Sequence, residues 1–229
     1  MSMQRKLKIR GILMVVSFFA LLGVIFTPVF PGKLNGLDYM DNLFNMISKG
    51  SSYFIPQSLV ESEKFIEKTI DATITVSNDR EAAEIAKLFV ASGAQVEVTG
   101  LDLKIQGNVG HIMKTALQDA DMMFNNNGKG LVDKYGYDEK RVMFNWWTSS
   151  SKISKYLTNE KRFDGAKLFD NIKKKAIEPA YNYYGVQIES WKANIGLVLA
   201  SLAFYVMYTL WYGFGLMYVF EGMGYKIGH

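Results

Sequence analysis

The sequence predicts an α+β membrane protein in which two transmembrane helices flank an extracytoplasmic domain with a ferredoxin-like βαββα unit plus additional helices. Three observations lead to this fold class. Two long uncharged apolar runs lie near the chain ends, a basic cluster precedes the first run, and strand and helix patterns alternate in the middle of the chain. At 229 residues, the chain has room for one folded domain beside its membrane segments.

The first apolar run covers residues 11–30 and carries no charged side chain. As a helix it would rise about 30 Å, the thickness of the hydrocarbon layer of a bilayer. A basic start followed by an apolar run also fits a cleaved signal peptide, but no small-x-small cleavage site follows. We therefore expect an uncleaved transmembrane helix, which Pro28 and Pro31 end at the outer interface.

The second apolar run, residues 193–220, has 28 positions without a charge. As a helix it would rise about 42 Å, so we expect it to tilt or to extend past the bilayer. Residues 1–10 hold four basic and no acidic side chains, which equals the whole formal net charge of +4. This excess predicts an inner-membrane protein with cytoplasmic termini, residues 1–10 and 221–229, and an extracytoplasmic (periplasmic) domain over residues 31–192.

Charge and composition exclude several classes of function. The domain balances 21 basic against 21 acidic side chains, so we expect no nucleic-acid partner. Cysteine is absent, and the two histidines, His111 and His229, lie far apart in the sequence, which argues against a metal or haem site. The segment 125–130 matches neither a P-loop nor a calcium loop and is interpreted as a helix end and turn. We expect no cofactor, no metal and no catalytic residues.

The middle of the chain, residues 70–126, is expected to form the core of the domain. Its elements follow the order β-α-β-β-α and are expected at residues 72–76, 78–93, 96–98, 101–105 and 109–120. This order supplies five of the six elements of a ferredoxin-like split βαβ unit. Because that fold hosts unrelated functions, it predicts none of them.

Helices are expected on both sides of this core. An amphipathic stretch at residues 37–47 is expected to lie on the outer membrane surface or beneath the domain. A further helix is expected to begin at Ser58, where Ser58 and Glu61 form a capping box. Residues 138–185 are expected to form the helical part of the domain.

The composition of the second apolar run indicates helix–helix contacts. Small residues at a spacing of four and three permit another helix to approach closely, and aromatic residues crowd the run further in. A tilted helix with two aromatic belts and a quinone- or lipid-lined site are alternative interpretations. The chain's own first helix is one candidate neighbour, through Ala20 and Gly23. The expected contact residues are Gly196, Ala200, Ala203, Tyr208, Trp211 and Tyr212.

Two aromatic clusters outside the membrane complete the predicted partner contacts: Trp146 with Trp147, and Tyr183 with Tyr184. Adjacent tryptophans on a helix cannot both face one small core, so we expect one of them to meet the bilayer interface or a partner protein. Burial of both in the core is the alternative.

These observations favour a non-catalytic accessory subunit or scaffold of a larger inner-membrane complex, in contact with membrane lipid and other integral membrane subunits. The alternative is a homo-oligomeric extracytoplasmic regulator or ligand sensor. A two-helix anchor around an α/β domain is similar to the layout of the polysaccharide co-polymerases, and this resemblance of layout implies the alternative. An enzyme is the least favoured class, because no motif supports one.

Overall fold

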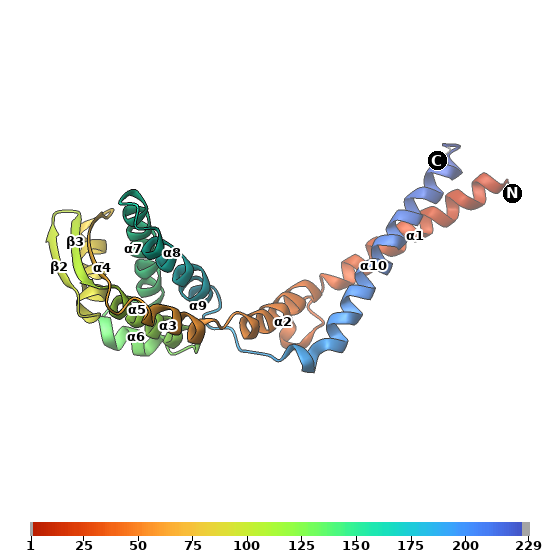
Figure 1. Ribbon diagram of the computed structural model, residues 1–229. Helices are drawn as coiled ribbons and strands as arrows, with labels where there is room; N and C mark the ends of the chain where they lie inside the picture. Colours follow the sequence, from red (N-terminus) through yellow and green to blue (C-terminus); the bar gives the residue numbers. More distant parts are fainter. Residues whose placement is uncertain (1, 226–229) are drawn as a thin grey trace. The chain divides into compact units, whose positions relative to one another are not determined.

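The computed structural model describes residues 2–225, which are mostly helical with one small three-stranded sheet (Figure 1). The chain divides into two compact units. The folded unit comprises residues 48–188, and the helix-pair unit comprises the chain up to residue 47 together with the chain from residue 189 onward. The helix-pair unit is therefore assembled from opposite ends of the sequence.

Two long apolar helices, α1 (Met3–Ile25) and α10 (Trp191–Gly222), form most of the helix-pair unit, to which most of α2 (Gly36–Ser51) also belongs. Both long helices are apolar and long enough to cross a membrane. Their most apolar windows are only 6% and 0% buried within the chain, unlike the core helices of a soluble protein. The chain thus has the two apolar helices that a two-span membrane protein requires.

The bounds of α1 differ from the predicted range of 11–30. The basic residues are helical too, because the side chain of Ser2 caps the first turn by accepting a hydrogen bond from the amide of Arg5 at 3.4 Å. At its other end the helix stops before Pro28, and the 3-10 helix η1 (Pro31–Lys33) follows.

The sheet of the folded unit contains β1 (Thr69–Thr75), β2 (Gln95–Thr99) and β3 (Asp102–Asn108). Strand β3 lies between the other two and is antiparallel to both, so the strand order is β1-β3-β2 and β1 runs parallel to β2. Helix α4 (Asp79–Ala91) connects β1 to β2, and α5 (Val109–Phe124) follows β3. The expected order β-α-β-β-α is present.

One face of this sheet is buried, because alternate residues of a strand point to opposite faces. Ile70, Ala72 and Ile74 of β1 are buried while their neighbours in the strand are exposed. The register places Ala72 opposite Ile105 and Ile74 opposite Leu103, which are also buried. These side chains belong to one continuous hydrophobic core with the apolar faces of α4 and α5.

Further helices complete the folded unit: α3 (Ile55–Glu63), α6 (Gly128–Tyr135), α7 (Glu139–Asn159), α8 (Phe163–Ile172), the π-helical turn η2 (Lys173–Ile177) and α9 (Glu178–Asn182). Helix α7 contacts α4, α8 and strand β1. Its buried side chains, among them Val142, Trp146 and Ile153, join the same core. The helical part and the sheet are therefore one folded body.

Within the folded unit, α3 and α6 differ from the sequence expectations. Helix α3 begins at Ile55 rather than Ser58, because Pro56 fits the first turn of a helix, where its missing amide leaves nothing unsatisfied. No expected element corresponds to α6. There, the side chain of Asn127 accepts a hydrogen bond from the amide of Gly130 and begins a new helix inside the segment interpreted as a turn.

Candidate functional site

The two long helices pack closely against each other at three glycines. A Cβ atom on Gly11 would stand 2.5 Å from the backbone nitrogen of Val219, and a Cβ atom on Gly222 would collide with the backbone of Lys8. Gly215 is buried, and a Cβ atom there would stand 3.1 Å from the Val15 side chain. At Gly11 and Gly222 only glycine allows this backbone-to-backbone packing of α1 against α10, and at Gly215 a side chain would make a tight contact.

Aromatic side chains of α10 extend the contact with α1. The hydroxyl of Tyr208 donates to the backbone carbonyl of Phe18 at 2.8 Å, and the indole nitrogen of Trp211 donates to the carbonyl of Met14 at 3.2 Å. The centroid of the Phe18 ring lies 4.1 Å from that of Tyr208 and 4.8 Å from that of Tyr212. These two polar groups thus find acceptors within the chain, which polar groups in an apolar environment need.

This contact occupies three of the residues that were expected to meet a partner, because Tyr208, Trp211 and Tyr212 all pack against α1. The expected route through Ala20 and Gly23 is wrong. Ala20 is exposed, and among the described residues no atom of another segment lies within 4 Å of a Cβ atom placed on Gly23. The helices instead meet through the glycines nearer the two chain ends.

The small-residue stripe of Gly196, Ala200 and Ala203 lies in the first half of α10, and all three residues are exposed. Within residues 2–225, nothing stands within 4 Å of a Cβ atom placed on Gly196. The contact with α1 therefore does not use this stripe, which remains an open surface of the chain.

The adjacent tryptophans of α7 separate into one buried and one exposed residue. Trp146 has no exposed surface, and Trp147 is 39% exposed. The indole nitrogen of Trp146 donates to Oδ2 of Asp119 at 2.8 Å, and its ring meets that of Phe89 edge to face at a centroid distance of 5.4 Å. A partner cannot reach a fully buried side chain, so only Trp147 of this pair stays a candidate contact.

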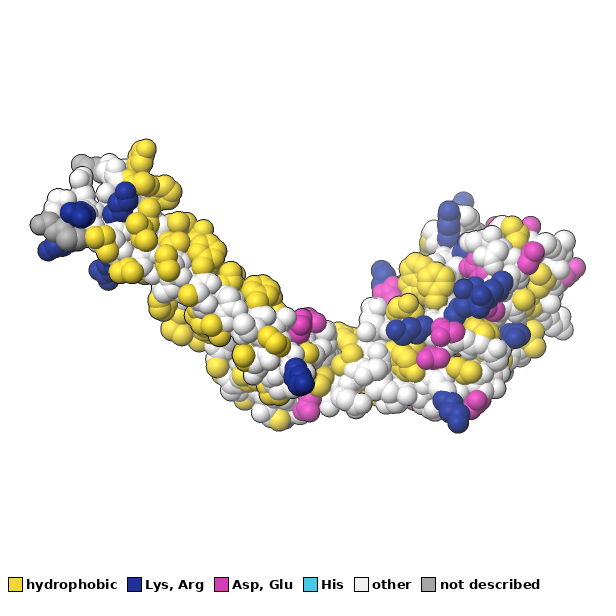
Figure 2. Space-filling view, turned by 180° about the vertical axis from the view of Figure 1, so that it is seen from behind, with side chains coloured by type: hydrophobic (Ala, Val, Ile, Leu, Met, Phe, Trp, Pro, Cys, Tyr) yellow, Lys and Arg dark blue, Asp and Glu magenta, His cyan; other side chains and the backbone are white. Residues whose placement is uncertain are grey.

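Trp147 lines an open groove of about 360 Å³ between α7 and α9. Phe144 and Tyr181 line it as well and are 50% and 41% exposed. The rings of Phe144 and Trp147 stack with centroids 6.1 Å apart, and the indole nitrogen of Trp147 donates to Oε1 of Glu178 at 2.8 Å. We call this surface the Trp147 groove; it is apolar with one carboxylate. Figure 2 shows hydrophobic side chains gathered among charged ones on the folded unit.

The remaining predicted contacts, Tyr183 and Tyr184, are half-buried. The hydroxyl of Tyr184 donates to Oε1 of Glu139 at 3.0 Å. The backbone carbonyl of Tyr183 accepts a hydrogen bond from Nζ of Lys49 at 3.0 Å. Both residues are therefore partly used within the folded unit, and each keeps some surface for a partner.

Lys49 is a buried cation that the sequence interpretation missed. It is 1% exposed, and its ammonium group also donates to the carbonyl of Val186 at 2.7 Å and to Oδ1 of Asn126 at 3.1 Å. In the part of the chain that the structure describes, no carboxylate forms a salt bridge with it, and burial lowers the pKa of Lys49. We call Lys49 and its three oxygen partners the Lys49 clamp.

Asp119 is a second buried polar centre outside the predicted site. It has no exposed surface, and its carboxylate accepts hydrogen bonds from Trp146, from the hydroxyl of Tyr135 and from Nζ of Lys134, the last at 2.7 Å. A signal for it exists in the sequence, because an acidic residue three positions after Ala116 falls on the apolar side of α5. This network joins three helices, α5, α6 and α7, and is structural.

No metal-ligand cluster of three or more histidine, cysteine, aspartate or glutamate side chains occurs in residues 2–225. His111 is exposed at the start of α5, where the side chain of Asn108 accepts a hydrogen bond from its amide at 2.9 Å. His229 lies outside the described residues.

Comparison with known proteins finds no matching protein family, no similar curated protein and no similar solved structure. The surfaces are therefore interpreted from their own chemistry. Two of them remain open to a partner: the stripe on α10 and the Trp147 groove.

Proposed function

We propose that this protein is a non-catalytic, membrane-anchored subunit or scaffold of a larger inner-membrane complex. In this proposal α1 and α10 cross the inner membrane, both chain ends lie in the cytoplasm, and the folded unit is extracytoplasmic. The basic start of the chain supports this orientation by the positive-inside rule. The strand order β1-β3-β2 supports a ferredoxin-like βαββα unit within the folded unit.

The observation that carries the proposal is that α10 has two separate surfaces suited to helix packing. The surface with Tyr208 and Trp211 is satisfied by α1. The stripe with Gly196, Ala200 and Ala203 is small and open. Another helix can approach such a stripe closely and gain dispersion contacts that disordered lipid chains match less well. We therefore assign the stripe to a helix of another subunit.

The packing of α1 supports its retention in the protein. A cleaved signal peptide would leave the hydroxyl of Tyr208 and the indole nitrogen of Trp211 without their acceptors on Phe18 and Met14. It would also expose the glycine surface of α10 that fits Gly11. An anchor that stays in place accounts for both features.

The Trp147 groove is the proposed second contact, outside the membrane. Protein interfaces are enriched in exposed tryptophan, tyrosine and phenylalanine, and Trp147, Tyr181 and Phe144 supply all three. The hydrogen bond from Trp147 to Glu178 fixes the indole before a partner binds, which lowers the entropy lost on binding.

The double substitution Gly196→Leu with Ala200→Leu tests the proposal. Leucine keeps the helix apolar, so we expect membrane retention to be unchanged while partner subunits no longer co-purify after mild detergent extraction. Gly213→Leu is the matched control, because it adds a leucine to α10 at another open glycine. Native mass and subunit composition are the readouts.

A stoichiometric heteromeric complex in the unsubstituted protein supports the proposal, and a pure homo-oligomer supports the extracytoplasmic regulator instead. Unchanged co-purification in the double variant would make α10 a plain anchor. It would move the partner contact to the Trp147 groove and to the half-buried Tyr183 and Tyr184.

A further inference from the structure

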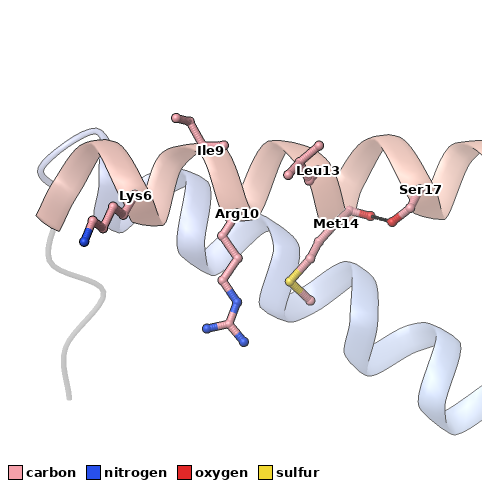
Figure 3. Close-up of a pocket in the computed structure, with 6 residues that line it drawn as sticks. All are labelled: Lys6, Ile9, Arg10, Leu13, Met14 and Ser17. Carbon is pink, nitrogen blue, oxygen red and sulfur yellow. Dashed lines mark hydrogen bonds between the residues drawn. The ribbon is translucent and has the colours of Figure 1, made fainter. Parts of the chain in front are cut away.

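The basic end of α1 carries a groove that the proposed function does not use (Figure 3). It has a volume of about 570 Å³ and is lined by Lys6, Ile9, Arg10, Leu13, Met14 and Ser17. Figure 3 shows Lys6, Arg10 and Met14 pointing to one side of the helix and Ile9 and Leu13 pointing to the other. The two charged residues lie together at the N-terminal end of the groove, and the lining beyond them is apolar except for Ser17.

Among the polar side chains that line this groove, only the two positively charged ones are free to bind a ligand. The hydroxyl of Ser17 donates to the carbonyl of Met14 at 2.9 Å, so it needs no further partner. The guanidinium of Arg10 lies 4.8 Å from the centroid of the Tyr218 ring on α10, which holds the charge in place. None of the salt bridges within the described chain includes Lys6 or Arg10.

The length of the groove matches one leaflet of a bilayer. Lys6 and Ser17 are eleven residues apart on α1, which corresponds to about 16 Å of helix. The hydrocarbon layer is roughly 30 Å thick, so the groove covers about half of it. A ligand with an anionic head and hydrocarbon chains the length of one leaflet complements both its charge and its extent.

We propose that this groove binds an anionic phospholipid of the cytoplasmic leaflet. The phosphate lies between Lys6 and Arg10 and accepts charge-assisted hydrogen bonds from both, and an acyl chain lies along Leu13 and Met14. The inference rests on the proposed membrane orientation, which places the basic end of α1 at the cytoplasmic surface.

Lipid retention by the full-length protein tests the inference. The protein is reconstituted into vesicles of phosphatidylglycerol and phosphatidylcholine and released with mild detergent. Native mass spectrometry then identifies and counts the lipids that stay bound. The test variant is Lys6→Gln with Arg10→Gln. The control is Arg5→Gln with Lys8→Gln, which removes the same charge from residues that do not line the groove. We expect selective retention of phosphatidylglycerol, weakened roughly tenfold or more in the test variant and preserved in the control.

Equal losses in both double variants would overturn the inference, because net charge alone would then explain lipid retention. Equal retention of the two lipids would overturn it as well. Full retention of phosphatidylglycerol by the test variant would also overturn it, whatever the oligomeric state of that variant.

Resistance of the protein to carbonate extraction distinguishes the lipid site from the proposed membrane anchor. A protein that stays in the membrane without selecting a lipid contradicts only the lipid site, whereas extraction of the unsubstituted protein contradicts the membrane anchor itself.

Discussion

The backbone carbonyl oxygen of Gly215 lies 2.8 Å from the position that a Cβ atom on Gly11 would occupy. The two long helices can therefore touch at this point only because Gly11 lacks a side chain. The hydrogen bonds of Tyr208 and Trp211 to the backbone of α1 lie in the same helix pair. Close glycine packing and these hydrogen bonds thus act together in holding α1 against α10.

Gly11→Leu should separate the two helices. We expect a destabilisation of the helix pair of about 1–3 kcal/mol from overpacking, because the leucine meets backbone atoms that cannot move aside. Thermal unfolding in detergent micelles, followed by circular dichroism and by tryptophan emission, measures it. Gly23→Leu on the same helix is the control, since its Cβ position is open. Equal effects of the two substitutions would contradict the glycine packing.

Asp119→Ala should be among the most destabilising single changes in the folded unit. It leaves the hydroxyl of Tyr135, the indole nitrogen of Trp146 and the ammonium of Lys134 without their acceptor. Breaking a buried ion pair of this kind costs about 3–5 kcal/mol. Asp121→Ala, two positions away on α5 and only partly buried, should cost much less. Denaturant unfolding of both variants measures the difference, and similar midpoints would rule out the network.

The folded unit should lose stability in alkali through two buried tyrosines. Burial raises the pKa of Tyr135 and of Tyr137 above the ordinary value of 10.0, and Asp119 raises that of Tyr135 further. Because the folded-state pKa is raised, their contribution is fully present below pH 10 and is lost as the pH rises towards the folded-state value. Lys49 acts in the opposite sense. Because its folded-state pKa lies below the ordinary 10.5, the unfolded chain binds this proton more tightly, and the contribution of Lys49 to the unfolding free energy rises as the pH approaches 10.5.

Tyr135→Phe isolates this effect. The unfolding free energy of the variant should fall less steeply above pH 10 than that of the unsubstituted protein, although the variant is less stable at neutral pH. Tyr181→Phe, at an exposed position, should leave the alkaline slope unchanged. Tyrosinate absorbance recorded during the titration reports the ionisation directly. Identical slopes for all three proteins would show that Tyr135 ionises as an exposed residue does.

Lys49→Met should loosen the segment that leaves the folded unit. Methionine fills the space but removes one of the two hydrogen bonds that each carbonyl of Tyr183 and Val186 accepts. The amide of Val186 and the side chain of Asn126 remain as donors, so we expect a cost of about 0.5–1.5 kcal/mol for each lost bond. Hydrogen exchange of the Gly185 amide, which donates to Asn126 at 2.7 Å, should become faster. Lys64→Met, at an exposed position, serves as the control. Unchanged exchange at Gly185 would mean that the clamp does not order this segment.

The elements of the fold were predictable where a pattern repeats along the chain. Alternation identified β1 and β3, helical periodicity identified α4, α5 and α7, and uncharged length identified α1 and α10. Trp146 and Trp147 show the limit, because both were expected to be partner contacts although Trp146 shares the apolar face of Val142 and Ile153 and is buried. Replacing Phe89, which closes over Trp146, by Ala is expected to cost about 3–5 kcal/mol.

The partners of the polar centres were not predictable, because they are distant in sequence, although the place of Asp119 on the apolar side of α5 marks it as a buried acid. Asp119 meets partners 15 to 27 positions away, and Lys49 meets acceptors 77 to 137 positions away. A single sequence shows Lys49 only as one more lysine near the end of an amphipathic helix. The partners of Tyr208 and Trp211 lie 190 and 197 positions away and are backbone carbonyls, which no residue type reveals.

The Lys49 clamp holds the two ends of the folded unit close together. It brings the point where the chain enters this unit within one lysine side chain of the point where the chain leaves it. A unit whose two ends adjoin can be transplanted into a surface loop of a host protein with little distortion of either partner. Residues 48–188 could therefore be moved as a cassette and assayed for partner binding in water, free of any bilayer.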